Sequence, residues 1–116
     1  MTIAVYGIKN CNTVKKAREW LDKHKVAYEF HDYKVEGVDP KRLQLWCDEF
    51  GWEALINRNG TTFRALPEAD KNNLGAAKAT KLMLAQPSMI RRPIVDLGAR
   101  RLVGFRLEDY REAFRK

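Results

Sequence analysis

One cysteine of this chain stands where a thiol could be activated as a nucleophile. Cys11 lies in the segment YGIKNCNTVKKA, where an apolar run ends and a helical pattern begins. The N-terminus of a helix presents unpaired N–H groups and a partial positive charge, and both stabilise an anion. Because the thiolate is the reactive form of cysteine, this position favours a catalytic role for Cys11. The alternative is a small hydrophobe tolerated in a loop.

The residues that follow Cys11 could help to bind an anionic group. Asn12 and Thr13 suit the first turn of a helix and could hydrogen-bond a thiolate or a bound anion. Lys15 is one of three lysines near the cysteine, in a stretch without acidic residues. We therefore interpret Cys11 as the catalytic residue and Asn12, Thr13 and Lys15 as candidate substrate-binding residues.

A second candidate group lies far along the chain, in the segment MIRRPIV. Cis peptide bonds occur almost only before proline, and a cis bond between Arg92 and Pro93 would present backbone groups to an extended peptide beside Cys11. Arg92 would supply a planar guanidinium for a carboxylate or an oxyanion. Taken alone, the segment is also compatible with solvated arginines before a trans proline.

We predict no catalytic or metal-binding role for the other cysteine or for the two histidines. Cys47 lies on the apolar face of a helical pattern with Leu43 and Phe50, and we expect a buried, inert thiol. His24 and His31 lack the partners of a metal site or of a cysteine–histidine pair. We therefore predict no metal site.

Composition limits the class of protein and of partner. The chain has 116 residues, a length typical of one domain, and a formal net charge of +7, which favours anionic partners. The basic residues form no block, so a nucleic acid is disfavoured. No apolar run approaches the ~18 residues of a membrane span, and MTIAVYG does not resemble a secretion signal. We expect a cytoplasmic monomer.

The hydrophobic pattern predicts which elements hold these residues. The expected order is a strand in TIAVYGI, a helix over 11–24, a strand over 26–33, a helix over 39–51, one or two helices over 67–86, a hairpin of 94–97 with 102–105, and a last helix near 107–114. This order predicts an α/β protein with a thioredoxin-like fold: a mixed four-stranded sheet, with Ile3–Tyr6 central and Leu102–Phe105 at or near an edge. We expect a single domain over 1–116, with a helical insert at about 36–90.

Beyond these patterns, the sequence resembles the arsenate reductase family of thioredoxin-like proteins, closest to its YffB-like branch of small proposed glutathione-dependent thiol reductases. Three segments carry the resemblance: YGIKNCNTVKKA, ALINRNGTTFRAL and LAQPSMIRRPIVDLG. It implies that Cys11 is the nucleophile, that Arg92 binds an anion and that Pro93 is cis. The family's mid-chain arginine would be Arg58, although a shift of one residue would put Asn57 there.

Two departures from the family pattern bear on activity. Arsenate reductases carry a third arginine in the final hairpin, and Gly104 takes that place in RRLVGF. This weakens the case for arsenate reduction, because an oxyanion adduct needs several cations at once.

The Spx-type regulators of the same family, which bind RNA polymerase, often carry a Cys-x-x-Cys switch. Here CNTV ends in Val14, which excludes an internal disulfide of that kind.

The resemblance implies an oxidoreductase, a glutathione-dependent thiol reductase with glutathione as co-substrate and no metal. Its substrate would be glutathione itself or another small anionic thiol compound. Arsenate reduction is one alternative. A regulator that binds RNA polymerase is another, from a different functional class.

Overall fold

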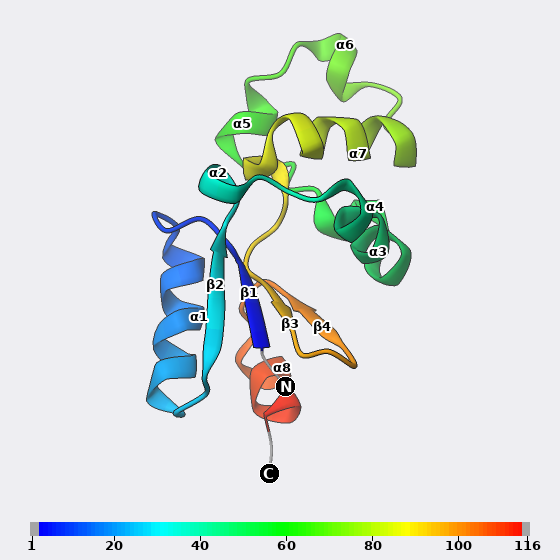
Figure 1. Cartoon of the computed structure of the whole chain (residues 1–116). Helices are drawn as coiled ribbons and strands as arrows, with labels where there is room; N and C mark the ends of the chain where they lie inside the picture. Colours follow the sequence, from blue (N-terminus) through cyan, green and yellow to red (C-terminus); the bar gives the residue numbers. More distant parts are fainter. Residues whose placement is uncertain (1–2, 115–116) are drawn as a thin grey trace. The chain divides into compact units, whose positions relative to one another are not determined.

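The computed structural model describes residues 3–114 (Figure 1). Within them the chain divides into two compact units. The first combines residues 3–36 with residues 92–114 and contains the whole β-sheet. The second is Gly37–Arg91 and is helical.

The first unit is built on a mixed sheet with the strand order β2-β1-β3-β4 (Figure 1). Strand β1 (Ile3–Gly7) pairs in parallel with β2 (Tyr28–Asp32) and antiparallel with β3 (Ile94–Asp96). Strand β4 (Arg101–Val103) pairs antiparallel with β3 and forms one edge. The predicted α/β, thioredoxin-like fold with a mixed four-stranded sheet, and the central place of β1, are confirmed.

Two helices cover one face of this sheet. Helix α1 (Asn12–Lys23) links the parallel strands β1 and β2, and its apolar stripe is Val14, Ala17 and Leu21, all fully buried. Helix α8 (Leu107–Ala113) adds Tyr110. The shared core cluster comprises Val5, Ala17, Leu21, Val95, Leu102 and Tyr110.

The pairing brings three chain segments to one edge of the sheet. Parallel strands end at the same edge, whereas an antiparallel neighbour begins there. Tyr6 is in register with His31 of β2 and with Ile94 of β3. The segments after β1 and after β2 therefore lie at the edge where β3 begins.

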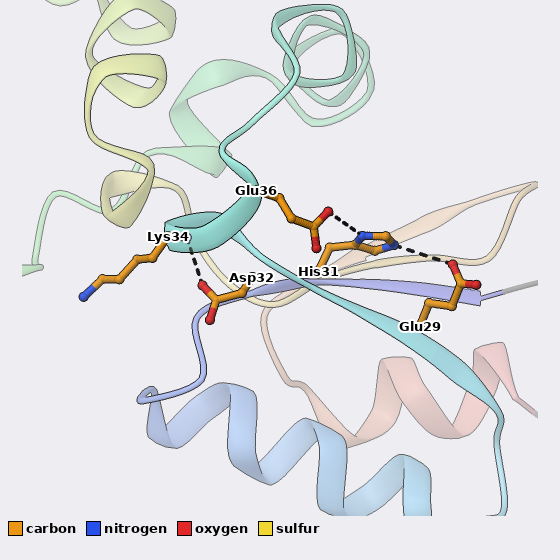
Figure 2. A network of polar contacts seen from close by, with 5 residues as sticks. All are labelled: Glu29, His31, Asp32, Lys34 and Glu36. Carbon is orange, nitrogen blue, oxygen red and sulfur yellow. Dashed lines mark hydrogen bonds and ion pairs between the residues drawn. The ribbon is translucent and has the colours of Figure 1, made fainter.

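Several predicted boundaries are shifted in the structure, and local geometry explains two of these shifts. The strand expected to run to residue 33 ends at Asp32, because the Asp32 carboxylate accepts the N–H of Lys34 at 2.9 Å and so caps the short helix α2 (Tyr33–Glu36) (Figure 2). The hairpin strand expected at 102–105 ends at Val103. Gly104 follows with a φ of +76°, a left-handed conformation that favours glycine.

The second unit consists of short helices around their own apolar residues. They are α3 (Pro40–Phe50), α4 (Trp52–Leu55), α5 (Thr61–Arg64), α6 (Glu68–Lys71), α7 (Ala76–Ala85) and the 3-10 turn η1 (Pro87–Met89). Helix α3 begins and ends as predicted: Asp39 accepts the N–H of Lys41 at 3.0 Å, and Gly51 terminates it with a φ of +84°.

Candidate active site

Cys11 is the N-cap residue of α1. Its backbone is extended, with φ −123° and ψ 124°, and its carbonyl accepts the N–H of Lys15 at 2.9 Å, the first bond of the helix. As a neutral thiol its side chain makes no capping hydrogen bond, since sulfur is a weak acceptor. The N–H groups of the first turn are thus available to the thiolate.

The surroundings of Cys11 favour its thiolate. Partial burial by itself would raise the pKa of the thiol. The N–H of Val14, a hydrogen bond from Arg92 together with its positive charge, and the N–H of Thr13 act in the opposite direction and prevail, so that the pKa of Cys11 is lowered. The side chain is partly exposed. A partly exposed thiol with a lowered pKa is suited to nucleophilic attack.

A close approach between β1 and α1 fixes this position. A Cβ atom on Gly7 would lie 2.9 Å from Cγ2 of Val14, closer than side chains tolerate. Val14 is fully buried, so it has little room to retreat. Glycine at the end of β1 therefore lets the first turn of α1 pack directly against the strand.

Arg92 and Pro93 lie at the same edge. Their peptide bond is cis. Pro93 is buried, and its carbonyl accepts the N–H of Gly104 at 2.8 Å, which ties the start of β3 to the end of β4. Arg92 is partly buried and acts on the Cys11 thiolate both by hydrogen bonding and by charge. The fold thus unites the cysteine with an arginine from the far end of the chain.

The other substrate-binding candidates of the first unit surround the cysteine. Asn12, Thr13 and Lys15 are exposed in the first turn of α1. Thr13 contributes its backbone N–H to the thiolate site. Contacts of these three side chains with a substrate stay predictions.

Asn57 and Arg58 belong to the second unit. The Asn57 side chain accepts the N–H of Asn59 at 3.1 Å and shapes the local turn. Arg58 is exposed, and its guanidinium carbon lies 5.5 Å from the ring centroid of Trp52. A role of either residue at the anion site stays a prediction, with Arg58 as the expected residue.

Sequence reasoning missed Tyr33. It is buried, with 2% of its surface exposed, at the start of α2. Burial raises its pKa strongly, the positive charge of Arg92 opposes this, and Tyr6 adds to it. No local signal in the sequence singles out Tyr33, because its place at this edge depends on the parallel register of β1 and β2.

His31 has a structural role that the sequence did not reveal. Figure 2 shows its ring between two carboxylates, with Nδ1 2.9 Å from Glu36 and Nε2 3.7 Å from Glu29. The ring also stacks on Tyr6 at a centroid distance of 4.9 Å. These contacts fasten α2 to β2 and fix the ring of Tyr6.

Cys47 differs from its prediction. It is partly exposed and not fully buried. Burial nevertheless raises the pKa of the Cys47 thiol, the charge of Asp48 adds to this, and a hydrogen bond with Thr80 only partly opposes it. The raised pKa favours the neutral thiol, and slower alkylation of Cys47 than of Cys11 stays a prediction.

Residues 3–114 contain no group of three or more His, Cys, Asp or Glu side chains placed to hold a metal ion. None of the helices in this range has the length and apolar composition needed to cross a bilayer.

Comparison with known proteins gives matches over nearly the whole chain. The model of the ArsC family matches residues 6–113. A solved structure of a protein named YFFB (PA3664) is 60% identical, with a TM-score of 0.94, over 97% of this chain and 98% of that chain. An arsenate reductase (ArsC) related protein from Brucella melitensis is 49% identical, with a TM-score of 0.78, over 100% and 97%. A global transcriptional regulator Spx of Streptococcus agalactiae is 31% identical over 111 residues, 94% of this chain and 80% of the relative.

Proposed function

This chain belongs to the ArsC family, and from that premise we propose that it is a thiol reductase that uses glutathione, with Cys11 as the nucleophile. The observation that carries the proposal is the environment of Cys11. Two N–H groups and the Arg92 guanidinium stabilise its thiolate, and the sulfur is partly exposed. Its substrates are disulfides in which glutathione is joined to another thiol.

In the first step the Cys11 thiolate attacks the glutathione sulfur of the substrate. The new bond is a mixed disulfide between Cys11 and glutathione, and the old disulfide bond breaks. The leaving thiolate takes a proton from water. The substrate thiol is now reduced, and the oxidising equivalent resides on Cys11.

In the second step a thiolate of free glutathione attacks the mixed disulfide. Oxidised glutathione leaves, and the Cys11 thiolate is restored for the next cycle. In sum, one substrate disulfide and one free glutathione give the reduced substrate thiol and one oxidised glutathione, which contains the glutathione released from the substrate. This scheme needs the reduced thiol pool of the cytoplasm, where we place the protein.

Recognition of glutathione rests on charge and hydrogen bonding. Glutathione is a net anion at neutral pH, and the chain carries a net charge of +7. At physiological salt that field fades within ~8 Å, so local contacts supply the specificity. Arg92 and the first-turn residues Asn12, Thr13 and Lys15 are the local groups. The Pro93 carbonyl already accepts the N–H of Gly104, but a carbonyl oxygen can accept a second hydrogen bond.

The test of the chemistry is incubation with oxidised glutathione followed by peptide mass spectrometry. We expect one glutathione adduct on Cys11 in the wild type and in Cys47→Ser, and none in Cys11→Ser. An adduct that forms equally on Cys47, or none on Cys11, contradicts the proposal.

The test of recognition is an NMR titration with reduced glutathione at millimolar concentration. We expect shifts for the residues around Cys11 and Pro93. If these resonances stay unchanged, glutathione is not the ligand and the regulatory alternative becomes the better explanation.

Arsenate reduction is the second candidate, favoured by the similarity to the arsenate reductase (ArsC) related protein of Brucella melitensis. The conformation of Gly104 opposes it. Its φ of +76° disfavours any larger residue, so residue 104, where the family resemblance would put the third arginine, is poorly suited to one. We expect that glutathione and arsenate together yield no arsenite above background.

Binding to RNA polymerase is the third candidate, favoured by the similarity to the Spx regulator. The position of the second switch cysteine is Val14, which is fully buried. Binding would therefore be independent of Cys11. Co-purification with RNA polymerase that survives Cys11→Ser would support this function, and its absence would remove it.

A further inference from the structure

Three exposed lysines flank Cys11 along the chain. Lys9 lies in the loop before the cysteine, and Lys15 and Lys16 lie in the first two turns of α1. Within residues 3–114, none of the three forms an ion pair with a carboxylate. We call Lys9, Lys15 and Lys16 the lysine rim.

The backbone keeps the lysine rim close to Cys11. Two residues of extended chain span at most about 7 Å, which limits the distance between the Cα atoms of Lys9 and Cys11. An α-helix rises about 1.5 Å per residue, so Lys15 and Lys16 lie roughly 6–8 Å from Cys11 along the axis of α1. At physiological salt the field of a charge extends ~8 Å. The rim charges therefore act on an anionic group that approaches the sulfur.

The carboxylates at the same edge of the sheet already have partners (Figure 2). Asp32 accepts the N–H of Lys34 at 2.9 Å, and Glu36 lies 2.9 Å from Nδ1 of His31. Along the chain, no acidic residue precedes Glu19. The positive charge of the lysine rim is thus available to a partner from solution.

Glutathione alone has too few carboxylates for these cations. It brings two carboxylates and one ammonium to the site. Arg92, which acts on the sulfur itself, and Lys15 are the proposed local cations for it. Lys9 and Lys16 are then left for the other half of the substrate disulfide, which approaches from solvent because Cys11 is partly exposed.

We propose that the lysine rim selects glutathionylated proteins whose modified cysteine is flanked by aspartate or glutamate. This rests on the proposed function, because it names the other half of the disulfide that Cys11 reduces. The Cys11 thiolate bonds to the glutathione sulfur, the old disulfide bond breaks, and the thiolate of the acidic protein leaves and takes a proton from water. Lys9 and Lys16 touch no reacting atom and act by attracting the acidic flank.

The main test compares two glutathionylated peptides of equal length, one with glutamate and one with glutamine beside the cysteine. We expect the wild type to reduce the acidic peptide with a kcat/KM roughly two- to tenfold higher, the size expected for a few exposed ion pairs. The preference should shrink as salt is added. Equal kcat/KM values for the two peptides would overturn the proposal.

The double variant Lys9→Gln/Lys16→Gln should lose most of this preference and keep its turnover of the neutral peptide. The matched control is Lys23→Gln/Lys25→Gln, which removes the same net charge at the other end of α1. Lys23 lies about 18 Å from Cys11 along the helix axis, so the preference should persist. Equal losses in the two double variants would show that only net charge matters, and would refute the lysine rim.

Alkylation by iodoacetamide, a neutral reagent, distinguishes substrate selection from an effect on the nucleophile. Arg92 is the one charged side chain among the causes of the lowered pKa of Cys11. Lys9→Gln/Lys16→Gln should therefore leave the alkylation rate of Cys11 unchanged. A fall as large as the loss of peptide preference would mean that the lysines act on the thiol, and would overturn the proposal.

Binding without turnover gives an independent test. An acidic peptide with serine in place of the cysteine should shift the NMR resonances of residues 9–16, and should bind Lys9→Gln/Lys16→Gln several-fold more weakly. A nucleic acid is the competing polyanion, but it offers no disulfide to Cys11. No shifts with the peptide, or tighter binding of a single-stranded DNA of equal charge, would overturn the proposal.

These outcomes separate the lysine rim from the proposed function. If both glutathionylated peptides are reduced at equal rates, thiol reduction stands and the lysine rim fails. If neither peptide is reduced but the serine peptide binds at residues 9–16, thiol reduction fails and the acidic-partner surface stands.

Discussion

The two cysteines of this chain are the same chemical group in two opposite environments. Cys11 caps the start of α1 in the first unit, and Cys47 lies in the last turn of α3 in the second. Both are partly exposed. The pKa of Cys11 is lowered, whereas the pKa of Cys47 is raised. Exposure therefore does not explain the difference.

The direction of the helix and the nearest charges explain it. Burial raises the pKa of both thiols. At Cys11 it is outweighed by the N–H groups of a helix N-terminus and by Arg92. At Cys47 the carbonyl already accepts the N–H of Gly51 at 2.7 Å, so the thiol stands near a helix C-terminus, and Asp48 adds negative charge. The opposite pKa shifts of the two thiols thus follow from the hydrogen-bond donors and charges around each of them.

The largest difference should appear in turnover. Cys11→Ser should reduce glutathione-dependent reduction of a small mixed disulfide to the uncatalysed rate, because the nucleophile is lost. Cys47→Ser should retain wild-type turnover. A coupled assay that measures oxidised glutathione gives the turnover of both variants. Substantial activity in Cys11→Ser would contradict the assignment of Cys11 as the nucleophile.

Arg92 should account for the next largest effect. Arg92→Ala should weaken glutathione binding about ten- to a hundredfold, the worth of one charge-assisted hydrogen bond of roughly 1.5–3 kcal/mol. Arg58→Ala should weaken it less. NMR titration of the wild type and both variants gives the dissociation constants. A larger effect at Arg58 than at Arg92 would assign the main anion contact to the second unit.

The pH dependence of alkylation measures the difference between the thiol pKa values of Cys11 and Cys47 directly. The lowered pKa of Cys11 leaves more thiolate at neutral pH, so its rate should rise with a midpoint below the ~8.5 of a free thiol. The raised pKa of Cys47 moves its midpoint above that value. Peptide mapping of iodoacetamide products against pH separates the two sites. Coincident midpoints would show that the helix ends are not the cause.

The smallest effect concerns helix stability. Asp39→Ala should lower the free energy of unfolding by about 1 kcal/mol, because the carboxylate caps α3. Cys11→Ser should raise it by a few tenths of a kcal/mol, about the lower end of capping effects, since serine caps a helix and the neutral thiol does not.

This comparison requires a pH below the Cys11 midpoint. A lowered folded pKa means that the thiolate stabilises the fold above the pKa of the free thiol, and that this contribution is lost as the pH falls through the folded pKa. Urea unfolding at such a pH measures both variants. A loss of stability in Cys11→Ser would indicate that the thiol itself caps α1.

The sequence by itself determined the local elements and the place of the nucleophile. Asp39, Pro40 and Gly51 mark the two ends of α3 because capping depends on neighbours within one turn. Cys11 could be placed at a helix start for the same reason, since the apolar positions of α1 begin directly after it. Such signals need only short stretches of chain.

The tertiary structure alone decided what surrounds the nucleophile. The sequence could suggest that Arg92 is important, but only the pairing of β1 with β3 brings it beside Cys11. Tyr33 was predicted as a strand residue, but it begins α2 and is buried, and its place at this edge depends on the parallel register of β1 and β2. Contacts between residues far apart in the chain are set by sheet register, and register follows from packing of the whole sheet.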